Sequence, residues 1–548
     1  MIEISTQGNK QVLLVDGAPF IMIAGEVHNS DSSSPAYMEG IWDQAQGLGM
    51  NTLLLPVSWE MTEPAEGSFD FSVPQTLIDQ ARARGMRIVF LWFGSWKNAE
   101  CMYAPEWVKR DLNRFPRAQI DKGKNKTGRR ISPSAPVTFP YTSLSYLGEE
   151  TCAADCRAFA TLMRFLKEYD GAEQTVLAVQ VENETGLLGA AREQSDLADQ
   201  RFAADAPQDF IRYMRENTAS MTPEIRAAVE RGAHAGSWRE VFGDAAEEIF
   251  SAYHVAGFVG AVARAGKKEY PLPMAVNCWL DKGGAPGTYP TGGPVSKVRE
   301  VWRYRAPAID LYAPDIYVPS FGAVCDEYTR RGEALFIPET ATHSYCAPRL
   351  AYVIGHYHAA CYSPFGFDDF GKPFSAVQGF LFGMDTTDPA LKTPQDPEEY
   401  RRMACLLREM TPLLAPAYGS DRLQAVSAET DPARPHPSGD PSLPARPGMS
   451  FGAFRVEATF DSPFSTRRDG VCLCLQVGAE ECYVAGSWCG LRFQSLREDA
   501  PNLDFALIEE GTFENGVWKP GRRLNGDEAA QLELKQPAAL HIKMITYP

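Results

Sequence analysis

The chain has 548 residues, a formal net charge of −17 and 44% hydrophobic residues. This length exceeds that of a single compact core, so at least two domains are expected. The acidic balance argues against nucleic-acid binding, which needs basic patches to neutralise phosphates. No apolar run approaches the roughly 20 residues of a membrane span, and the one basic run, Lys122–Arg130, is expected to be a solvated loop.

The first residues, MIEISTQGNKQVLLVDG, lack the charged-then-apolar order of a signal peptide, which predicts a cytoplasmic protein. The twelve cysteines include no pair of CxxC motifs, so reduced and mostly buried thiols are expected instead of a zinc site. We therefore expect no metal, no cofactor, and neither a nucleic acid nor a membrane as partner. Whether the chain forms a homo-oligomer stays open.

Short apolar runs followed by amphipathic runs repeat over residues 1–370, which predicts strands that alternate with helices. The predicted strands are Phe20–Ala24, Thr52–Val57, Arg87–Trp92, Val176–Val181, Pro273–Asn277, Ile309–Ile316, Ala334–Ile337 and Ala359–Tyr362. The predicted helices are Tyr37–Leu48, Pro74–Arg84, Cys152–Tyr169, Ala245–Ala265 and Pro397–Leu414. Gly49 and Gly85 each close a helix directly before a strand, as a left-handed stop signal does.

Eight strands alternating with helices predict an α/β fold, a (β/α)8 TIM barrel, over residues 1–417, with a helical insertion around 187–268. An open doubly wound sheet is the alternative, but no G-x-G-x-x-G motif follows the first strand and no P-loop occurs. Residues 418–548 predict a C-terminal all-β, sandwich-like domain that includes a Pro-rich linker at 430–449. Its predicted strands are Phe454–Phe460, Val471–Val477, Cys482–Ala485, Leu532–Leu534 and Leu540–Tyr547.

Active sites of such barrels lie at the carboxyl ends of the strands. The residues that follow the predicted strands are carboxylates, amides, aromatics and one histidine: Glu26, His28, Trp59, Glu60, Glu63, Trp96, Asn98, Glu100, Glu182, Asn183, Glu184, Asn277, Trp279, Asp315, Tyr317, Glu339, Phe367, Asp368 and Asp369. Carboxylates and amides hydrogen-bond to sugar hydroxyls, and aromatic faces stack on the apolar face of a pyranose. This set therefore predicts a sugar site.

Two carboxylates carry the predicted chemistry. Glu184 follows the fourth strand and Glu339 the seventh, so they are expected to face one another across the barrel mouth. Glycoside hydrolysis needs such a pair, one carboxyl to protonate the leaving oxygen and one to attack or activate water. On a continued strand Glu182 would face the same side as Glu184, and it is expected to lie below it in a hydrogen-bond network. The alternative is that these residues only cap the barrel.

Four motifs resemble glycoside hydrolase family 35, in clan A, with its compact bacterial β-galactosidase branch. They are GEVHNS (Gly25–Ser30), NTLLLPVSWEMTEPAEGSFDF (Asn51–Phe71), KNAEC (Lys97–Cys101) and QVENETG (Gln180–Gly186). The resemblance covers residues 8–415. It implies a retaining β-galactosidase in which Glu184 is the acid/base and Glu339 the nucleophile. The substrate-binding residues expected beside them are Trp96, Asn98, Glu100, Asn183, Tyr317, Glu26, Trp59 and Asn277.

The chain departs from the family pattern at three positions. Trp96 and Thr185 each replace a usual Tyr, and Cys101 replaces a usual Trp. Galactose and glucose differ at one hydroxyl, so a β-glucosidase or a β-glucosyltransferase on the same barrel stays an alternative. A non-catalytic carbohydrate-binding protein is a second alternative, against which the intact carboxylate pair argues. The expected partner in each case is an oligosaccharide or glycoside.

Overall fold

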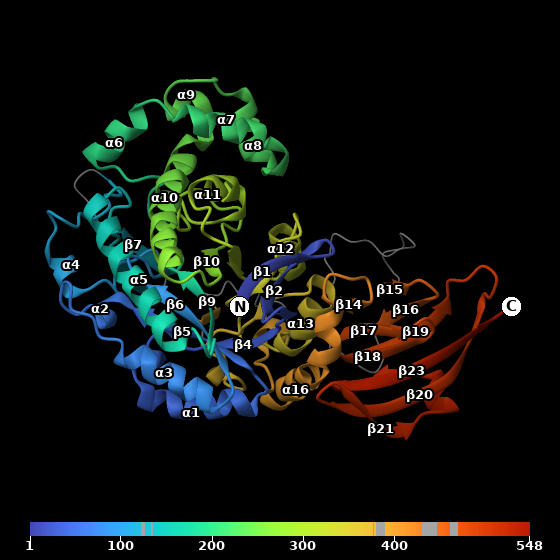
Figure 1. Ribbon diagram of the computed structural model, residues 1–548. Coiled ribbons are helices and arrows are strands. Elements are labelled where there is room, and N and C mark those ends of the chain that lie inside the picture. Colours follow the sequence, from blue (N-terminus) through green and yellow to red (C-terminus); the bar gives the residue numbers. More distant parts are fainter. Residues whose placement is uncertain (122–126, 133–134, 376–377, 380–388, 430–446, 461–468) are drawn as a thin grey trace. The chain divides into compact units, whose positions relative to one another are not determined.

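The computed structural model of the chain describes all residues except 122–126, 133–134, 376–377, 380–388, 430–446 and 461–468 (Figure 1). The predicted linker at 430–449 thus lies almost wholly outside the described residues. The chain divides into two compact units. We call residues Met1–Val27, Gly40–Leu53 and Ile316–Pro548 the first unit, and residues His28–Glu39 and Leu54–Asp315 the second unit.

Eight strands form one sheet in the order β11-β10-β9-β6-β5-β4-β13-β12, a nearly closed (β/α)8 barrel. The strands are β4 (Met22–Glu26), β5 (Thr52–Ser58), β6 (Arg87–Phe93), β9 (Val176–Val181), β10 (Met274–Trp279), β11 (Leu311–Asp315), β12 (Phe336–Ile337) and β13 (Cys361–Tyr362). A parallel bridge joins Ile316, directly after β11, to Thr340, just after β12. The predicted barrel is therefore confirmed.

The strand bounds differ most from the predicted ones at β11, where Leu311–Asp315 replaces the predicted Ile309–Ile316. β12 and β13 each have two paired residues where four were predicted, because an apolar run can continue beyond the residues that pair. β9 has its predicted bounds, and every one of its residues is buried. Burial on both faces is the reason that parallel strands read as continuous apolar runs.

Amphipathic helices follow the strands. The helices between the strands are α1 (Pro35–Gly47), α2 (Trp59–Thr62), α3 (Ser72–Ala83), α4 (Glu106–Arg110), α5 (Glu149–Asp170), α11 (Arg299–Arg305), α12 (Phe321–Tyr328) and α13 (Cys346–Tyr352). Gly49 lies three residues before β5 and Gly85 two residues before β6, and their φ angles are 83° and 65°. Glycine adopts these left-handed conformations at little steric cost, and they confirm the predicted stop signals.

The second unit carries a helical insertion between β9 and β10. Its helices are α6 (Asp196–Ala203), α7 (Gln208–Glu216), α8 (Pro223–Arg231), α9 (Trp238–Phe242) and α10 (Ala246–Glu269). Helices α5 and α10 lie side by side (Figure 1). A Cβ atom at Gly266 would come 2.3 Å from the ring of Phe159, so glycine permits this close approach.

A hairpin in the second unit was not predicted. It consists of β7 (Thr127–Ser132) and β8 (Ala135–Tyr141). The expectation that Lys122–Arg130 is a loop is therefore wrong for residues 127–130, and residues 122–126 lie outside the described part. The alternation of polar and apolar residues in this segment is too weak to signal a strand, and pairing with β8 supplies the order that the sequence pattern lacks.

The first unit contains two further strand systems. An antiparallel sheet of β1 (Ile2–Gln7), β2 (Lys10–Val15) and β3 (Ala18–Pro19) precedes the barrel. After α16 (Pro397–Leu414), which has its predicted bounds, come two all-β sheets with the orders β14-β17-β18-β23-β20-β21 and β15-β16-β19-β22. Their strands are β14 (Leu423–Ser427), β15 (Gly448–Phe451), β16 (Phe454–Thr459), β17 (Val471–Gly478), β18 (Glu481–Ser487), β19 (Cys489–Ser495), β20 (Asn502–Glu514), β21 (Val517–Arg523), β22 (Glu533–Leu534) and β23 (Ala538–Tyr547).

These two sheets share one apolar core, as a sandwich does. Phe454 and Val456 come from one sheet, and Cys474, Val484 and Ile542 from the other. The predicted all-β domain is thereby confirmed. All twelve cysteines of the chain are free and most are buried, as expected.

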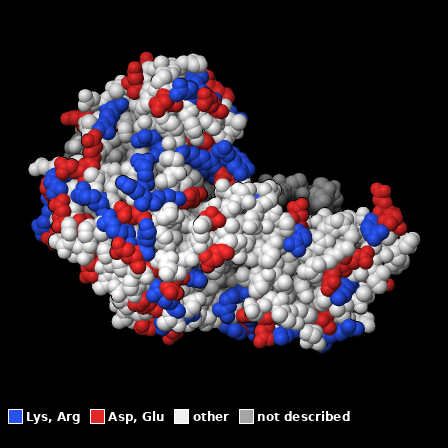
Figure 2. Space-filling view, viewed as in Figure 1, with Lys and Arg blue, Asp and Glu red and all other residues white. Residues whose placement is uncertain are grey.

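Charged side chains of both signs are interspersed over the face that Figure 2 presents. Ion pairs of the chain include Arg114 with Glu66 and Glu150, and Arg164 with Glu269. Exposed pairs of this kind contribute little to stability individually. Every helix within the described residues is too short or too polar to cross a lipid bilayer.

Candidate active site

Two neighbouring strand-end loops of the second unit are tied together. We call residues 94–101 the β6 loop and residues 182–186 the β9 loop. The backbone N–H of Ala99 donates to the carbonyl of Glu184 at 3.0 Å, and the N–H of Asn183 donates to the carbonyl of Trp96 at 3.3 Å. Lys97 Nζ also donates to Asn183 Oδ1, at 3.0 Å. The predicted N-A-E and E-N-E segments therefore form one polar surface.

Four residues of these loops have left-handed backbone conformations. The φ angles are 55° at Asn98, 59° at Ala99, 62° at Glu182 and 45° at Glu184. Such conformations are uncommon outside glycine and persist where surrounding contacts enforce them. They also correct one expectation. The strand ends at Val181, so strand alternation does not set the directions of Glu182 and Glu184.

The backbone N–H of Glu184 is held through two successive hydrogen bonds from the next two strands of the barrel. Its N–H donates to Asn277 Oδ1 at 2.9 Å, and Asn277 Nδ2 donates to Asp315 Oδ2 at 2.9 Å. Asn277 lies on β10 and Asp315 ends β11. The side chain of Glu184 is only partly buried. Both backbone groups of Glu184 are therefore fixed by hydrogen bonds, while the residue as a whole stays partly exposed.

Asn183 and Lys97 form a donor site. Asn183 is fully buried and its Nδ2 has no hydrogen-bond partner among the described residues. Its oxygen is taken by Lys97, which is itself only 6% exposed. The amide is thus oriented with its NH2 group available to a hydroxyl acceptor. Sequence reasoning missed Lys97, although its place between Trp96 and Asn98 in a strand-end loop was a usable signal.

The other predicted residues of the β6 loop lie close to this surface. Trp96 is 1% exposed and packs edge-to-face on Phe258 of α10, with ring centroids 4.8 Å apart. Asn98 Oδ1 is buried without a partner in the described part of the chain. Burial raises the pKa of Glu100. Asn98 and Glu100 therefore offer an amide and a carboxyl group beside the β9 loop.

A buried acid pair supports both loops from below. Asp155 Oδ2 accepts hydrogen bonds from the N–H and the hydroxyl of Ser95, and Asp155 Oδ1 accepts one from Trp92 Nε1 at 2.9 Å. Glu182 Oε2 accepts from the N–H of Trp96 at 2.8 Å, as the expected network requires. Both carboxyl groups are fully buried, and they hydrogen-bond to one another.

One of these two carboxyl groups must carry a proton to make their mutual hydrogen bond. Burial, together with the charge of Asp155, raises the pKa of Glu182 well above its usual range. Asp155 has three donors from Ser95 and Trp92, which stabilise its charged form. We therefore assign the proton to Glu182. Sequence reasoning missed Asp155, whose signal is an acidic residue on the apolar face of α5.

The second predicted carboxylate lies in the first unit, directly after β12. Glu339 is 5% exposed, and its Oε2 accepts a hydrogen bond from the hydroxyl of Tyr317 at 2.7 Å. Its Oε1 is buried without a hydrogen-bond partner among the described residues. The carbonyl of Glu339 accepts from the N–H of Ile316. One carboxylate oxygen is therefore anchored and the other is available for chemistry.

Glu26 and Trp59 are buried completely. Glu26 ends β4 in the first unit, and its backbone is bonded to the segment around Pro364 and Gly366. In the second unit the indole N–H of Trp59 donates to Glu63 Oε2 at 2.7 Å, and its ring meets Trp107 edge-on. The indole N–H of Trp59 is therefore occupied within its own unit.

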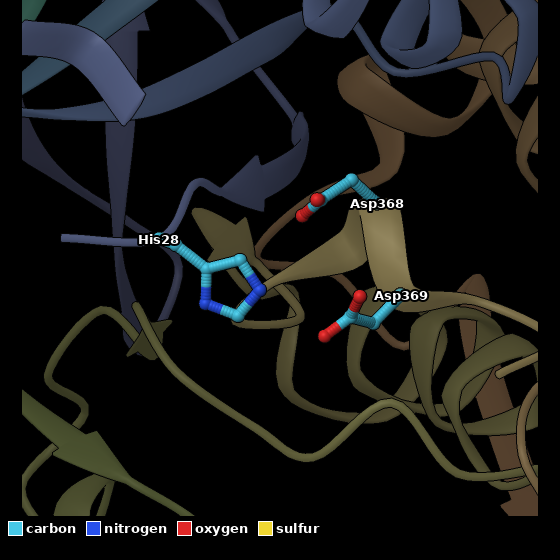
Figure 3. A group of neighbouring side chains, drawn as sticks. All are labelled: His28, Asp368 and Asp369. Carbon is cyan, nitrogen blue, oxygen red and sulfur yellow. The ribbon is translucent and has the colours of Figure 1, made fainter. Parts of the chain in front are cut away.

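Figure 3 draws three further strand-end residues. His28 belongs to the second unit, and its N–H donates to Asp31 Oδ2 at 3.0 Å. Asp368 and Asp369 belong to the first unit, on the short helix η6 (Phe367–Asp369). These residues follow the first and the eighth strand, as the predicted order of elements requires.

A curated relative and several solved structures are similar to parts of this chain. A β-galactosidase from Xanthomonas manihotis is 29% identical over 199 residues, which cover 36% of this chain and 28% of that protein. The chain thus spans well under half of that relative in the match. The structure of a β-galactosidase from Rahnella sp. R3 is similar with a TM-score of 0.45 and 13% identity, over 72% of this chain and 57% of that one. The structure of a GH42 β-galactosidase from G. stearothermophilus is similar with a TM-score of 0.45 and 13% identity, over 76% of this chain and 59% of that one.

Two families match parts of the chain. Residues 403–534 match a domain of unknown function, DUF5597, which covers most of the C-terminal strands. Residues 12–119 match glycosyl hydrolases family 35. This segment contains β4, β5 and β6 together with the β6 loop. The family match over residues 12–119 and the curated relative agree with the resemblance of the barrel motifs to glycosyl hydrolases family 35.

Proposed function

We propose that the chain is a retaining exo-β-galactosidase that removes non-reducing-end galactosyl residues from oligosaccharides. The observation that supports this most directly is the state of Glu339. Tyr317 holds one of its oxygens at 2.7 Å, and the other is buried and unpartnered among the described residues. An anchored carboxylate with one free oxygen suits a nucleophile. The match of residues 12–119 to family 35 supports the substrate class.

In the first proposed step Glu339 Oε1 attacks the anomeric carbon while Glu184 donates its proton to the glycosidic oxygen. The bond from the anomeric carbon to that oxygen breaks, and the leaving sugar departs as an alcohol. The product is a glycosyl ester on Glu339. In the second step Glu184, now ionised, takes a proton from water, and the water oxygen displaces Glu339. The pair must lie roughly 5–5.5 Å apart for this route.

Binding of the galactosyl unit is assigned to the polar groups around this pair. The free Nδ2 of Asn183, the free Oδ1 of Asn98 and the carboxyl of Glu100 would bond to hydroxyls. Trp96, Tyr317, Glu26, Trp59 and Asn277 are proposed to shape the pocket or to hold its members. Residues 1–417 would carry the activity, and residues 418–548 would form a separate β-rich domain.

The proposal is tested with matched aryl substrates. Nitrophenol release from nitrophenyl β-galactoside is expected to exceed that from the β-glucoside by at least about tenfold, because one misplaced hydroxyl leaves buried polar groups unpaired. A preference for the glucoside would retain the mechanism and reassign the sugar. Absence of release from both, together with binding of free galactose, would favour a non-catalytic carbohydrate-binding protein.

Tyr317→Phe is expected to lower kcat by about tenfold and to leave KM within about threefold. The change removes one charge-assisted hydrogen bond of roughly 1.5–3 kcal/mol and leaves the rest of the side chain in place. Steady-state rates on nitrophenyl β-galactoside measure this. An unchanged kcat would show that the Tyr317–Glu339 bond has no part in turnover. Tyr312→Phe, a change on β11, is the matched control.

A further inference from the structure

The loop that follows β10 in the second unit is rich in glycine and yet closely packed. We call residues 280–295 the β10 loop, and its glycines are Gly283, Gly284, Gly287, Gly292 and Gly293. Glycine permits many backbone conformations, so this composition by itself predicts a flexible segment. Residues 289–295 are nevertheless all buried. Contacts with other parts of the second unit must therefore fix the loop.

The β10 loop pairs with the backbone that continues from Glu184. The N–H of Leu187 donates to the carbonyl of Thr291 at 2.9 Å, and the N–H of Thr291 donates to the carbonyl of Leu187 at 3.0 Å, which makes an antiparallel bridge. Leu187 lies three residues after Glu184, and Asn277 of β10 accepts from the N–H of Glu184. Strand β10 and the β10 loop therefore hold the chain at Glu184 and just beyond it.

Glycines on both sides of this contact let the two backbones touch. Gly186 has φ of 133°, and a Cβ atom there would come 2.6 Å from the carbonyl oxygen of Pro290. A Cβ atom at Gly293 would come 2.3 Å from the carbonyl oxygen of Thr185. Main chain thus meets main chain directly, with no side chain between them to absorb a shift. A displacement of the β10 loop would therefore move residues 185–187.

A buried group of charged side chains holds the β10 loop against α10. Lys297, two residues after the loop and 9% exposed, places Nζ 3.0 Å from Oε2 of Glu248 on α10, which is 3% exposed. The other oxygen of Glu248 accepts from the hydroxyl of Tyr289, within the loop. Lys297 Nζ also lies 4.8 Å from the ring centroid of Tyr289 and 3.6 Å from Oδ2 of Asp281. One carboxylate therefore joins the loop and the residue just after it to one helix.

This ion pair is better suited to fixing a conformation than to raising stability. The cost of taking two charges out of water largely offsets their attraction, so the pair adds little net stability. If one partner is removed, the other remains as a buried charge without compensation, and the loop must move to expose it to water. The pair thus penalises every position of the loop in which Lys297 and Glu248 are apart.

We infer that Glu248 and Lys297 are positioning residues for Glu184. They fix the β10 loop, and the β10 loop fixes the backbone that carries the carboxyl group of Glu184. The inference rests on the proposed function, in which Glu184 protonates the leaving oxygen. General acid catalysis requires this carboxyl group within hydrogen-bond reach of that oxygen, and a shift of about 1 Å can cost about 10²-fold in rate.

The test compares two leaving groups, because only one of them needs the proton from Glu184. The sugar that leaves from lactose needs it, whereas dinitrophenolate leaves unprotonated. The value of kcat/KM for dinitrophenyl β-galactoside therefore reports formation of the glycosyl-enzyme without acid catalysis. Lys297→Met removes the cation and keeps a chain of similar length. Tyr289→Phe removes only the hydroxyl that binds Glu248, and it is the milder variant.

A control variant separates positioning from a general loss of stability. Arg82→Met leaves the fully buried Asp170 without its ion-pair partner, which lies 2.8 Å away. Asp170 also accepts from the N–H of Val176, at the start of β9, whereas Glu184 lies beyond the end of that strand. Arg82→Met should therefore lower the denaturant midpoint without moving the β10 loop.

For Lys297→Met in the full chain we expect kcat/KM on lactose to fall about tenfold or more, while that on dinitrophenyl β-galactoside stays within about threefold of the parent. Tyr289→Phe should shift the ratio of the two values in the same direction by about threefold. Arg82→Met should leave the ratio within about twofold. The amide hydrogen of Leu187 should exchange about tenfold faster or more in Lys297→Met, because its partner Thr291 is released, and at the parent rate in Arg82→Met.

An unchanged ratio in Lys297→Met and Tyr289→Phe would overturn the inference, as would an equal loss on both substrates or an equal change of ratio in Arg82→Met. If Lys297→Met does not fold, Tyr289→Phe decides alone. If the parent chain releases galactose from neither substrate, the proposed function fails, and hydrogen exchange at Leu187 decides whether Lys297 and Glu248 fix the backbone beyond Glu184. Exchange at the parent rate in both variants would overturn that as well.

Discussion

Glu339→Gln is expected to lower kcat for nitrophenyl β-galactoside by at least about 10⁴-fold, because an amide cannot form the glycosyl ester on which the reaction depends. The substitution keeps the shape of the side chain and an oxygen that can accept the hydroxyl of Tyr317. Sugar binding should therefore survive, and galactose affinity measured by calorimetry should stay within about fivefold. This separation of turnover from binding distinguishes a lost nucleophile from a damaged fold.

Glu184→Ala is expected to behave differently with different leaving groups. General acid catalysis contributes about 10²–10⁴-fold, so lactose hydrolysis should fall by that amount. Dinitrophenolate leaves without protonation, so glycosyl-enzyme formation from dinitrophenyl β-galactoside should be spared and its breakdown should limit the rate. Added azide, a nucleophile that needs no base, should then restore turnover and give β-galactosyl azide.

Controls keep these two results interpretable. Glu333→Gln changes a carboxylate six residues before Glu339, on the amino-terminal side of β12, and should leave kcat unchanged. Proton NMR of the first-formed anomer tests retention directly. A first product of α configuration would contradict the proposed double displacement, and it would imply two carboxyl groups separated by about 6.5–9.5 Å with a water between them.

The second large effect concerns the buried pair Asp155 and Glu182. Replacing each carboxyl group by an amide should change the unfolding free energy by different amounts. Glu182→Gln should be tolerated, since its amide can donate to Asp155 and still accept from the N–H of Trp96. Asp155→Asn should cost about 2–4 kcal/mol of unfolding free energy. Its NH2 group would face donors from Ser95 or Trp92, which leaves buried N–H or O–H groups without acceptors.

The loss in Asp155→Asn should also reach the active site. Glu182 holds the N–H of Trp96, and Trp96 in turn is bonded to Asn183. A shift of the β6 loop would therefore misplace Asn98, Asn183 and Glu184, whose carbonyl accepts from the N–H of Ala99. We expect kcat/KM on nitrophenyl β-galactoside to fall about tenfold or more in Asp155→Asn, since small displacements of positioned groups are costly. If Glu182→Gln were instead more damaging than Asp155→Asn, the shared proton would belong to Asp155.

The pH dependence of stability follows from the raised pKa of Glu182. Below the unfolded pKa of about 4.3 both states hold this proton. Above it the unfolded chain releases the proton while the folded chain keeps it, so stability falls as pH rises through the folded pKa. Glu182→Gln removes this contribution. Denaturant unfolding of the two chains should give free energies that diverge in favour of Glu182→Gln as pH rises.

A glycine beside the pair offers an independent check. A Cβ atom at Gly94 would come 2.4 Å from Trp92 Nε1, which donates to Asp155, 2.7 Å from Glu182 Oε1 and 3.0 Å from Asp155 Oδ1. Gly94→Ala should therefore separate the two carboxyl groups and reproduce part of the Asp155→Asn phenotype. Gly40→Ala, where a Cβ atom would meet nothing, is the matched control and should be neutral. Equal stability of the two variants would argue against a tightly packed pair.

Hydrophobic periodicity alone predicted the barrel strands and α16. Strands buried on both sheet faces have long apolar runs, and a helix buried on one face has apolar residues at a 3.6-residue repeat. Periodicity failed for β7, β8, the N-terminal sheet and five C-terminal strands, all of which depend on their pairing partners. The missed C-terminal strands are β14, β15, β19, β20 and β21. Strand-end positions of Glu184 and Glu339 also followed from the order of elements, since Glu184 lies three residues after β9 and Glu339 two residues after β12.

The sequence by itself determined the family motifs, the order of the elements and which polar residues follow each strand. Only the tertiary structure decided how those residues are held. Four contacts hold them, and each joins positions 22–93 residues apart in the sequence. They are Lys97 with Asn183, Asn277 with Glu184, Tyr317 with Glu339 and Asp155 with Glu182. Hydrogen bonds between such distant positions leave no periodic pattern in a chain, because they depend on where folding brings the backbone and on which rotamers burial permits.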